Sequence, residues 1–169
     1  MNKGQYVFSQ LMNLVDANEF NRHVKRYKGN YRVRSFSCWH QFLCMSFGQL
    51  AKKDSLRDTV LCLESHENKL YHLGITNGVS RSTLSDANEQ RDYRIYQDFA
   101  LYLISESRQL YDDTDDTDLG LKNNIYAIDA STIDLCLSVF WWAPFRKTKA
   151  AIKLHTQIDI KCSIPTFIH

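Results

Sequence analysis

The chain has 169 residues, of which 44% are hydrophobic, and it carries a net charge of +2. This length holds one domain, or one small domain and part of another. Two prolines and six glycines argue against a fibrous or disordered chain, and the small net charge excludes a histone-like binder. Any binding of nucleic acid must therefore come from local clusters of basic residues.

Cellular context follows from the cysteines and the N-terminus. Five cysteines with no CxxC pair indicate reduced thiols and not a disulfide framework or a zinc ribbon. The N-terminus lacks a charged segment followed by an apolar one, so we expect no signal peptide. No apolar run reaches the roughly 18 residues that a membrane span needs. We expect a cytoplasmic protein with no membrane partner and no small-molecule substrate.

The first part of the chain has apolar side chains at helical spacing. Two short helices are expected within residues 7–27, with Asp16 capping the second. Another helix opens at Ser55, which has Asp58 at capping-box spacing. We therefore expect a helical domain over residues 1–74.

Two further helices are expected in a connector over residues 75–111, one from Ser80 and a longer one near 93–111. The first of them, with the preceding helix and a short turn, is a candidate helix-turn-helix. Arginine and asparagine side chains can read DNA bases, although an ordinary exposed helix face explains the same pattern. The residues expected to point outward are Arg81, Ser82, Ser85, Asn88 and Arg91.

Residues 112–118 contain five acids, which repel one another and indicate a solvated linker. Beyond this linker the hydrophobic period changes from 3.6 to 2, as in a half-buried strand over 151–161. A further strand is expected over 164–168. The predicted fold class is therefore α+β, with a helical N-terminal block before an incomplete β block over 119–169. The apolar face of the longer strand comprises Ile152, Leu154, Thr156, Ile158 and Ile160.

Asp129 is the first candidate for chemistry, because it lies in an apolar strand and is followed by hydroxyl side chains. Phosphoryl transfer with two metal ions needs several carboxylates that converge on ions about 4 Å apart. A rigid strand fixes such an acid well. The alternative is a structural aspartate that hydrogen-bonds Ser131 and Thr132 in a turn.

Two basic clusters are candidates for contact with DNA phosphates. The denser cluster follows Trp141 and Trp142, which could stack on an unpaired base. A solvated hairpin turn explains the denser cluster equally well, and a solvated loop is the commoner meaning of the other cluster. The denser cluster comprises Arg146, Lys147, Lys149 and Lys153, and the other comprises Arg22, Lys25, Arg26, Lys28, Arg32 and Arg34 around Tyr27 and Tyr31.

Residues 128–137, 140–142, 145–151 and 153–155 resemble, in order and spacing, the start of the catalytic core of insertion-sequence-four-type DDE transposases. Residues 79–84 and 87–92 resemble the segment before that core, and the helical domain over residues 1–74 resembles, more loosely, the family's accessory or DNA-binding domain. The resemblance implies an RNase-H-like core over 119–169, with Asp129 as the first of three catalytic acids. It also implies Mg²⁺ or Mn²⁺ as cofactor, transposon-end DNA as partner, and a homo-oligomer as a further candidate assembly.

The family's second aspartate, in an Asp-Arg-Gly-Tyr-like motif, and its glutamate, in a Tyr-Arg-Glu-Lys-like motif, have no match in these 169 residues. We therefore expect a truncated, N-terminal portion of a transposase that is inactive alone and binds no metal tightly. The alternative is a non-enzymatic helical module that binds DNA or a protein, such as an inhibitor of transposition.

Overall fold

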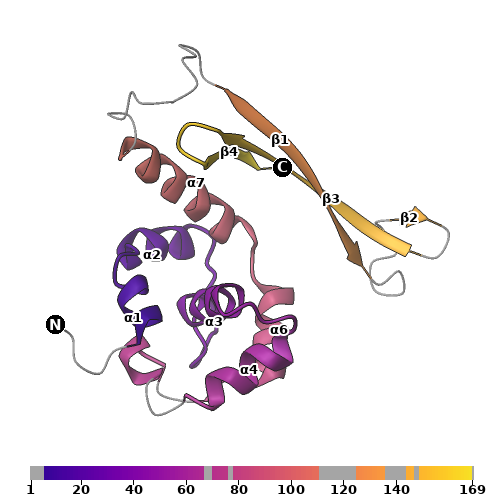
Figure 1. Cartoon of the computed structure of the whole chain (residues 1–169). Coiled ribbons are helices and arrows are strands. Elements are labelled where there is room, and N and C mark those ends of the chain that lie inside the picture. The colour runs from indigo at the N-terminus through magenta and orange to yellow at the C-terminus, as the bar shows by residue number, and fades with distance from the viewer. Residues whose placement is uncertain are drawn as a thin grey trace. The chain divides into compact units, whose positions relative to one another are not determined.

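The computed structural model describes residues 6–66, 70–75, 78–110, 125–135, 144–146 and 149–168 (Figure 1). The chain divides into two compact units, Met1–Phe99 and Ala100–His169. The first unit is helical, and the second contains the end of a helix and an antiparallel sheet. The predicted α+β class with a helical N-terminal part is confirmed.

The helices predicted within residues 7–27, from Ser55, from Ser80 and near 93–111 are all found close to those positions. The final helix, α7, crosses from the first unit into the second. The elements are α1 (Val7–Met12), α2 (Ala17–Arg26), α3 (Cys38–Leu50), α4 (Leu56–Glu64), the 3-10 helix η1 (Tyr71–Leu73), α6 (Arg81–Gln90) and α7 (Arg94–Gln109).

Side chains cap these helices where the sequence predicted it. Asp16 Oδ1 accepts hydrogen bonds from the backbone N–H groups of Asn18, at 2.8 Å, and Glu19, at 3.2 Å. Ser55 Oγ accepts from the N–H of Asp58 at 3.1 Å and donates to its carboxylate at 2.7 Å. Each cap satisfies a backbone donor that the first helical turn leaves without a partner.

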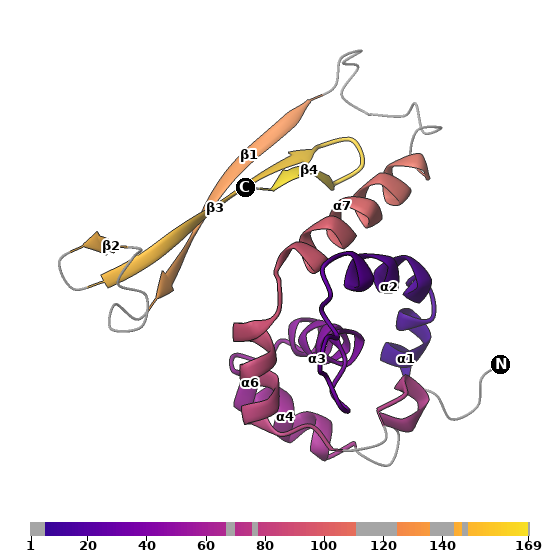
Figure 2. The same ribbon diagram turned by 180° about the vertical axis from the view of Figure 1, so that it is seen from behind.

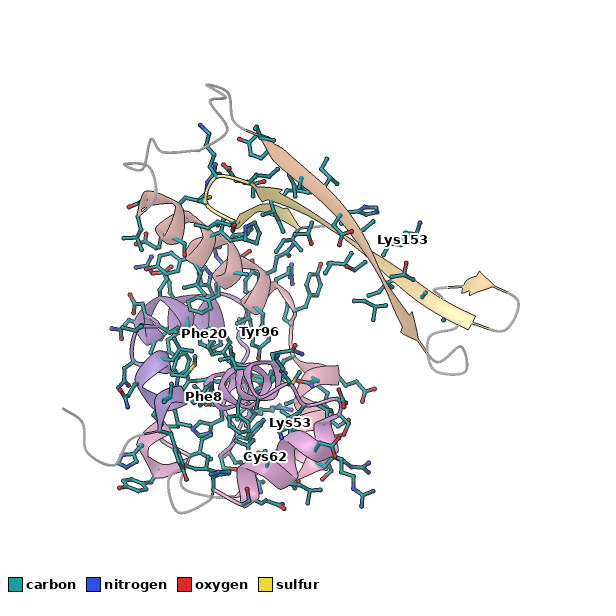
Figure 3. The ribbon with its side chains drawn as sticks, in the orientation of Figure 1. Phe8, Phe20, Lys53, Cys62, Tyr96 and Lys153 are labelled. Atoms are coloured by element: carbon teal, nitrogen blue, oxygen red, sulfur yellow. The ribbon has the colours of Figure 1, made fainter. Side chains whose placement is uncertain are left out.

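The core of the first unit has an aromatic part and an aliphatic part. Phe20 of α2 is fully buried, and its ring contacts Trp39 of α3 and Tyr96 and Phe99 of α7 (Figure 3). These ring centroids are 5.1–5.9 Å apart, a range in which tilted and edge-to-face aromatic pairs are favourable. The aliphatic part includes Leu43, Cys44, Val60, Leu63 and Leu84 from α3, α4 and α6.

The sheet of the second unit is built around one long strand. It comprises β1 (Tyr126–Leu135), β2 (Pro144–Arg146), β3 (Lys149–Asp159) and β4 (Ile164–Ile168). β3 pairs antiparallel with all three of the others, and Figure 2 shows β1 and β4 alongside it from behind. The strands predicted over 151–161 and 164–168 are thus confirmed, whereas the predicted linker over 112–118 lies outside the described residues.

The apolar face predicted for β3 is largely exposed. Ile152, Leu154 and Ile160 keep 40%, 37% and 44% of their surface accessible, while Ala150 and Asp159 are buried. Thr156 and Ile158 of the same face are half-buried, so the expected half-buried strand is found for only part of this face. A period of two identifies a strand, but it does not specify that another layer covers one of its faces.

Candidate nucleic-acid interface

Asp129 lies in the middle of β1, and its side chain is exposed. Its register partner on β3 is Thr156. Ser131 Oγ donates a hydrogen bond to Asp129 Oδ2 at 3.3 Å. The carboxylate is thus accessible to a ligand, and it also makes the local hydroxyl contact that the structural interpretation of this residue predicts.

The register of β1 and β3 separates Asp129 from Lys153. Directly opposed residues share a face of a sheet, and faces alternate along a strand. Asp129 shares its face with Ser131 and Leu154, whereas Lys153 pairs with Thr132 and lies on the other face. By this register, no second acidic residue of β1 or β3 lies on the face of Asp129. The described residues contain no group of three or more side chains suited to hold a metal ion.

Asp159, the buried acid of β3, has structural partners. Its Oδ1 accepts from the N–H of Lys161 at 3.0 Å, and its backbone carbonyl accepts from Ser163 at 2.8 Å. Arg108 of α7 has a guanidinium nitrogen 3.9 Å from Asp159 Oδ2. These contacts hold the turn between β3 and β4.

The denser basic cluster is described only in part. Arg146 of β2 and Lys149 of β3 are register partners. Lys153 is exposed on β3. Lys147, Trp141 and Trp142 lie outside the described residues.

The candidate recognition helix α6 presents only some of its predicted residues to solvent. Arg81 and Ser82 are exposed, and Ser82 Oγ lies 3.0 Å from Ser80 Oγ. Arg91 instead points inward, which corrects the prediction. Its guanidinium donates to the backbone carbonyls of Phe36 and Ser37, the latter at 2.8 Å.

Gln41, which is 4% exposed, is the centre of the polar network that holds Arg91. Its side-chain oxygen accepts from Arg91 at 2.8 Å and from the Tyr96 hydroxyl at 2.6 Å. Its amide nitrogen donates to Asn88 Oδ1 at 2.5 Å. Burial raises the pKa of Tyr96, so its hydroxyl stays protonated and donates. Asn88 and Arg91 therefore fix α6 to α3 and α7.

The short turn of a helix-turn-helix does not join α4 to α6. α4 ends at Glu64 and α6 begins at Arg81, and η1 lies between them. Both α4 and α6 pack against α3 and against each other. Residues 65–80 thus separate α4 from α6, and the helix-turn-helix expected within residues 75–111 stays a prediction.

A cleft of about 480 Å³, which we call the connector cleft, lies between residues 27–36 and α6. Its connector side includes Tyr27, Lys28, Tyr31 and Arg34. Its helix side includes Thr83, Asp86 and Gln90, and Arg91 and Phe36 also line it. The sequence analysis selected the basic residues of the connector but not Asp86 or Gln90, which only the fold brings opposite them.

The connector is fastened at several points. The N–H of Gly29 donates to the carbonyl of Val24 at 2.9 Å, and Asn30 Oδ1 accepts from the N–H of Cys38 at 2.8 Å. Lys28 and Arg32 have left-handed backbone conformations, with φ of 52° and 57°. Such angles are uncommon for residues with a side chain, and they persist where surrounding contacts enforce them.

Comparison with known proteins identifies one domain. Residues 3–76 match a family model described as a domain of unknown function (DUF4372). This range includes α1 to η1 and the connector side of the cleft, whereas α6 lies beyond it. No curated protein and no solved structure matches the chain. In the part of the chain that the structure describes, every helix is too short or too polar to cross a membrane.

Proposed function

We propose that this protein binds DNA and is related to DDE-type transposases, with Asp129 as the first acid of their catalytic triad. The observation that carries the proposal is the position of Asp129 as an exposed acid on β1. The residues around it resemble, in order and spacing, the start of the transposase core. A strand paired along its length fixes the direction of such a carboxylate.

Mg²⁺ or Mn²⁺ is the cofactor that this resemblance implies. Carboxylate oxygen is a suitable ligand for both ions. However, Asp129 has no second acid on its face of β1 and β3, and several carboxylates are needed to hold two ions. The described residues therefore do not form a complete metal site, and no cleavage step is assigned to them.

The lack of a second acid on the face of Asp129 favours a second candidate function, a non-enzymatic module that binds DNA or a protein partner. A chain that supplies one acid could occupy transposon ends without cutting them and so inhibit transposition. The two candidates differ in whether Asp129 matters for activity when the remaining acids are supplied by another chain.

Salt-dependent DNA binding tests the proposal. The affinity of the 169-residue chain for a labelled duplex is measured between low and high salt. When the logarithm of the affinity is plotted against the logarithm of the salt concentration, each neutralised phosphate contributes about −0.9 to the slope. Replacing Arg146, Lys147 and Lys149 together by alanine is expected to weaken binding and reduce the slope. Replacing Lys52, Lys53 and Arg57 by alanine removes the same charge and serves as the matched control. Affinity that does not change with salt would contradict the proposal.

A further inference from the structure

We propose that the connector cleft binds a single unpaired nucleotide of DNA. In this arrangement, Lys28 and Arg34 hold its phosphate, Tyr31 stacks on its base, and Asp86 and Gln90 contact the edge of the base. The proposal rests on the proposed DNA binding and names which part of the DNA enters this cleft.

The size of the cleft favours one nucleotide over a duplex. Its volume of about 480 Å³ lies within the range of roughly 300–1,000 Å³ typical of small-ligand sites. A double helix presents its grooves to a protruding element of a protein, such as an α-helix. A recess of this size instead suits a base that has left the stack, as in enzymes that extrude a nucleotide from the duplex.

Some basic side chains near the cleft form ion pairs with carboxylates, and others do not. Arg94 is paired with Asp92 at 2.6 Å, and Arg26 with Asp98 at 3.1 Å. Lys28 and Arg34, by contrast, are exposed and form no ion pair within the described ranges. They both line the cleft and are therefore available to a phosphate.

An aromatic ring and hydrogen-bonding groups line the same cleft. Tyr31 is 69% exposed, and the Arg32 guanidinium lies over one face of its ring, 5.2 Å from the centroid, so a base would stack on the opposite face. On α6, the carboxylate of Asp86 can accept from the amino groups of a base, and the amide of Gln90 can both donate and accept. These edges are fully accessible only in an unpaired base.

The cleft is formed before any ligand arrives. Arg91 links α6 to the carbonyls of Phe36 and Ser37, and Asn30 anchors the connector to the start of α3. Because these contacts lie within the protein, the connector and α6 need little further ordering when a ligand binds, and the entropic cost of binding is small.

Fluorescence anisotropy on the 169-residue chain tests the proposal with two labelled DNAs. One is a fully paired duplex, and the other is the same duplex with one unpaired nucleotide at an end. We expect the second to bind roughly tenfold more tightly, because stacking one base contributes on the order of a factor of ten. Tyr31→Ala is expected to abolish this preference, and Arg34→Gln to reduce it.

The matched controls are Tyr93→Ala, at a tyrosine that is 72% exposed and outside the cleft, and Arg57→Gln on α4. Both are expected to keep the preference. Equal binding of the two DNAs by the unaltered protein, or a preference that survives both cleft variants, overturns the nucleotide site and leaves DNA binding intact. Failure to bind either DNA overturns DNA binding itself, and with it this site.

Discussion

The hydroxyl of Tyr27 donates a hydrogen bond to Asp98 Oδ2 at 2.6 Å and so ties the end of α2 to α7. This bond, supported by Arg26, holds the pKa of Asp98 below its usual range. Because the folded state keeps the carboxylate charged to lower pH than the unfolded chain does, the bond stabilises the fold above about pH 4. That contribution is lost as the pH falls through the lowered pKa.

Asp98→Asn should therefore lower the melting temperature at pH 7 by roughly 3–6 °C, since a hydrogen bond to a charged group contributes on the order of 1 kcal/mol. The difference from the unaltered protein should shrink as the pH falls below 4. Thermal unfolding followed by circular dichroism between pH 3 and 7 measures both effects. Asp54→Asn, at an exposed carboxylate with no ion pair in the described residues, is the control. A constant difference across this range would contradict the assignment.

Gly29→Ala should destabilise the first unit. The added Cβ would overlap Cδ1 of Ile95 and lie 2.8 Å from Sγ of Cys38, both in the core. Overpacking of this kind costs about 1–3 kcal/mol, measurable by urea unfolding. Adding Ile95→Val removes the overlapping methyl group and should recover part of the loss. A double variant less stable than both single variants would show that the clash lies elsewhere.

Arg91→Lys tests whether Arg91 is a structural residue or a reader of DNA bases. A lysine cannot reproduce the forked contact with Phe36, Ser37 and Gln41. The partly buried carbonyls of Phe36 and Ser37 would lose a donor, at about 1–3 kcal/mol. Urea unfolding should show the loss, whereas Arg57→Lys on α4 should have little effect. Weaker DNA binding with unchanged stability would instead support the outward orientation of Arg91 that the sequence predicts.

The 169-residue chain should neither cleave nor join DNA in the presence of Mg²⁺ or Mn²⁺. The physical reason is that Asp129 is the one acid matching the transposase triad, and a single carboxylate cannot organise two ions. Incubation with labelled duplex, followed by denaturing electrophoresis, measures this. Turnover that Asp129→Ala abolishes would prove the expectation wrong.

Local signals in the sequence were sufficient for the helix starts but not for the interface. Asp16 and Ser55 cap their helices through contacts within three residues, so spacing alone predicts them. The inward orientation of Arg91 depends on carbonyls more than fifty positions away, and no local pattern encodes it. The connector cleft likewise required α6 to pack against α3. The alternation of β3 predicted its strand but not the exposure of Ile152.

The exposure of apolar side chains on the sheet predicts that its amides are less protected from hydrogen exchange than those of the helical unit. In the described residues β1 pairs on one side only, with β3, and Ile128 of β1 is 75% exposed. Small sheets with uncovered apolar surface are marginal and tend to associate. The amides of β1 should therefore exchange faster than those of α3 in dilute protein. Equal protection of β1 and α3 in a monomer would indicate a self-sufficient β unit.

The connector between α2 and α3 would ordinarily be a place where a protein accepts extra residues. Here Gly29 lies against the core, Asn30 caps the entry to α3, and Arg91 holds the carbonyls at the far end. An insertion anywhere between residues 29 and 37 would separate these three anchors and move the start of α3. The segment therefore has the length constraint of a core element, and related chains should vary it by substitution and not by insertion or deletion.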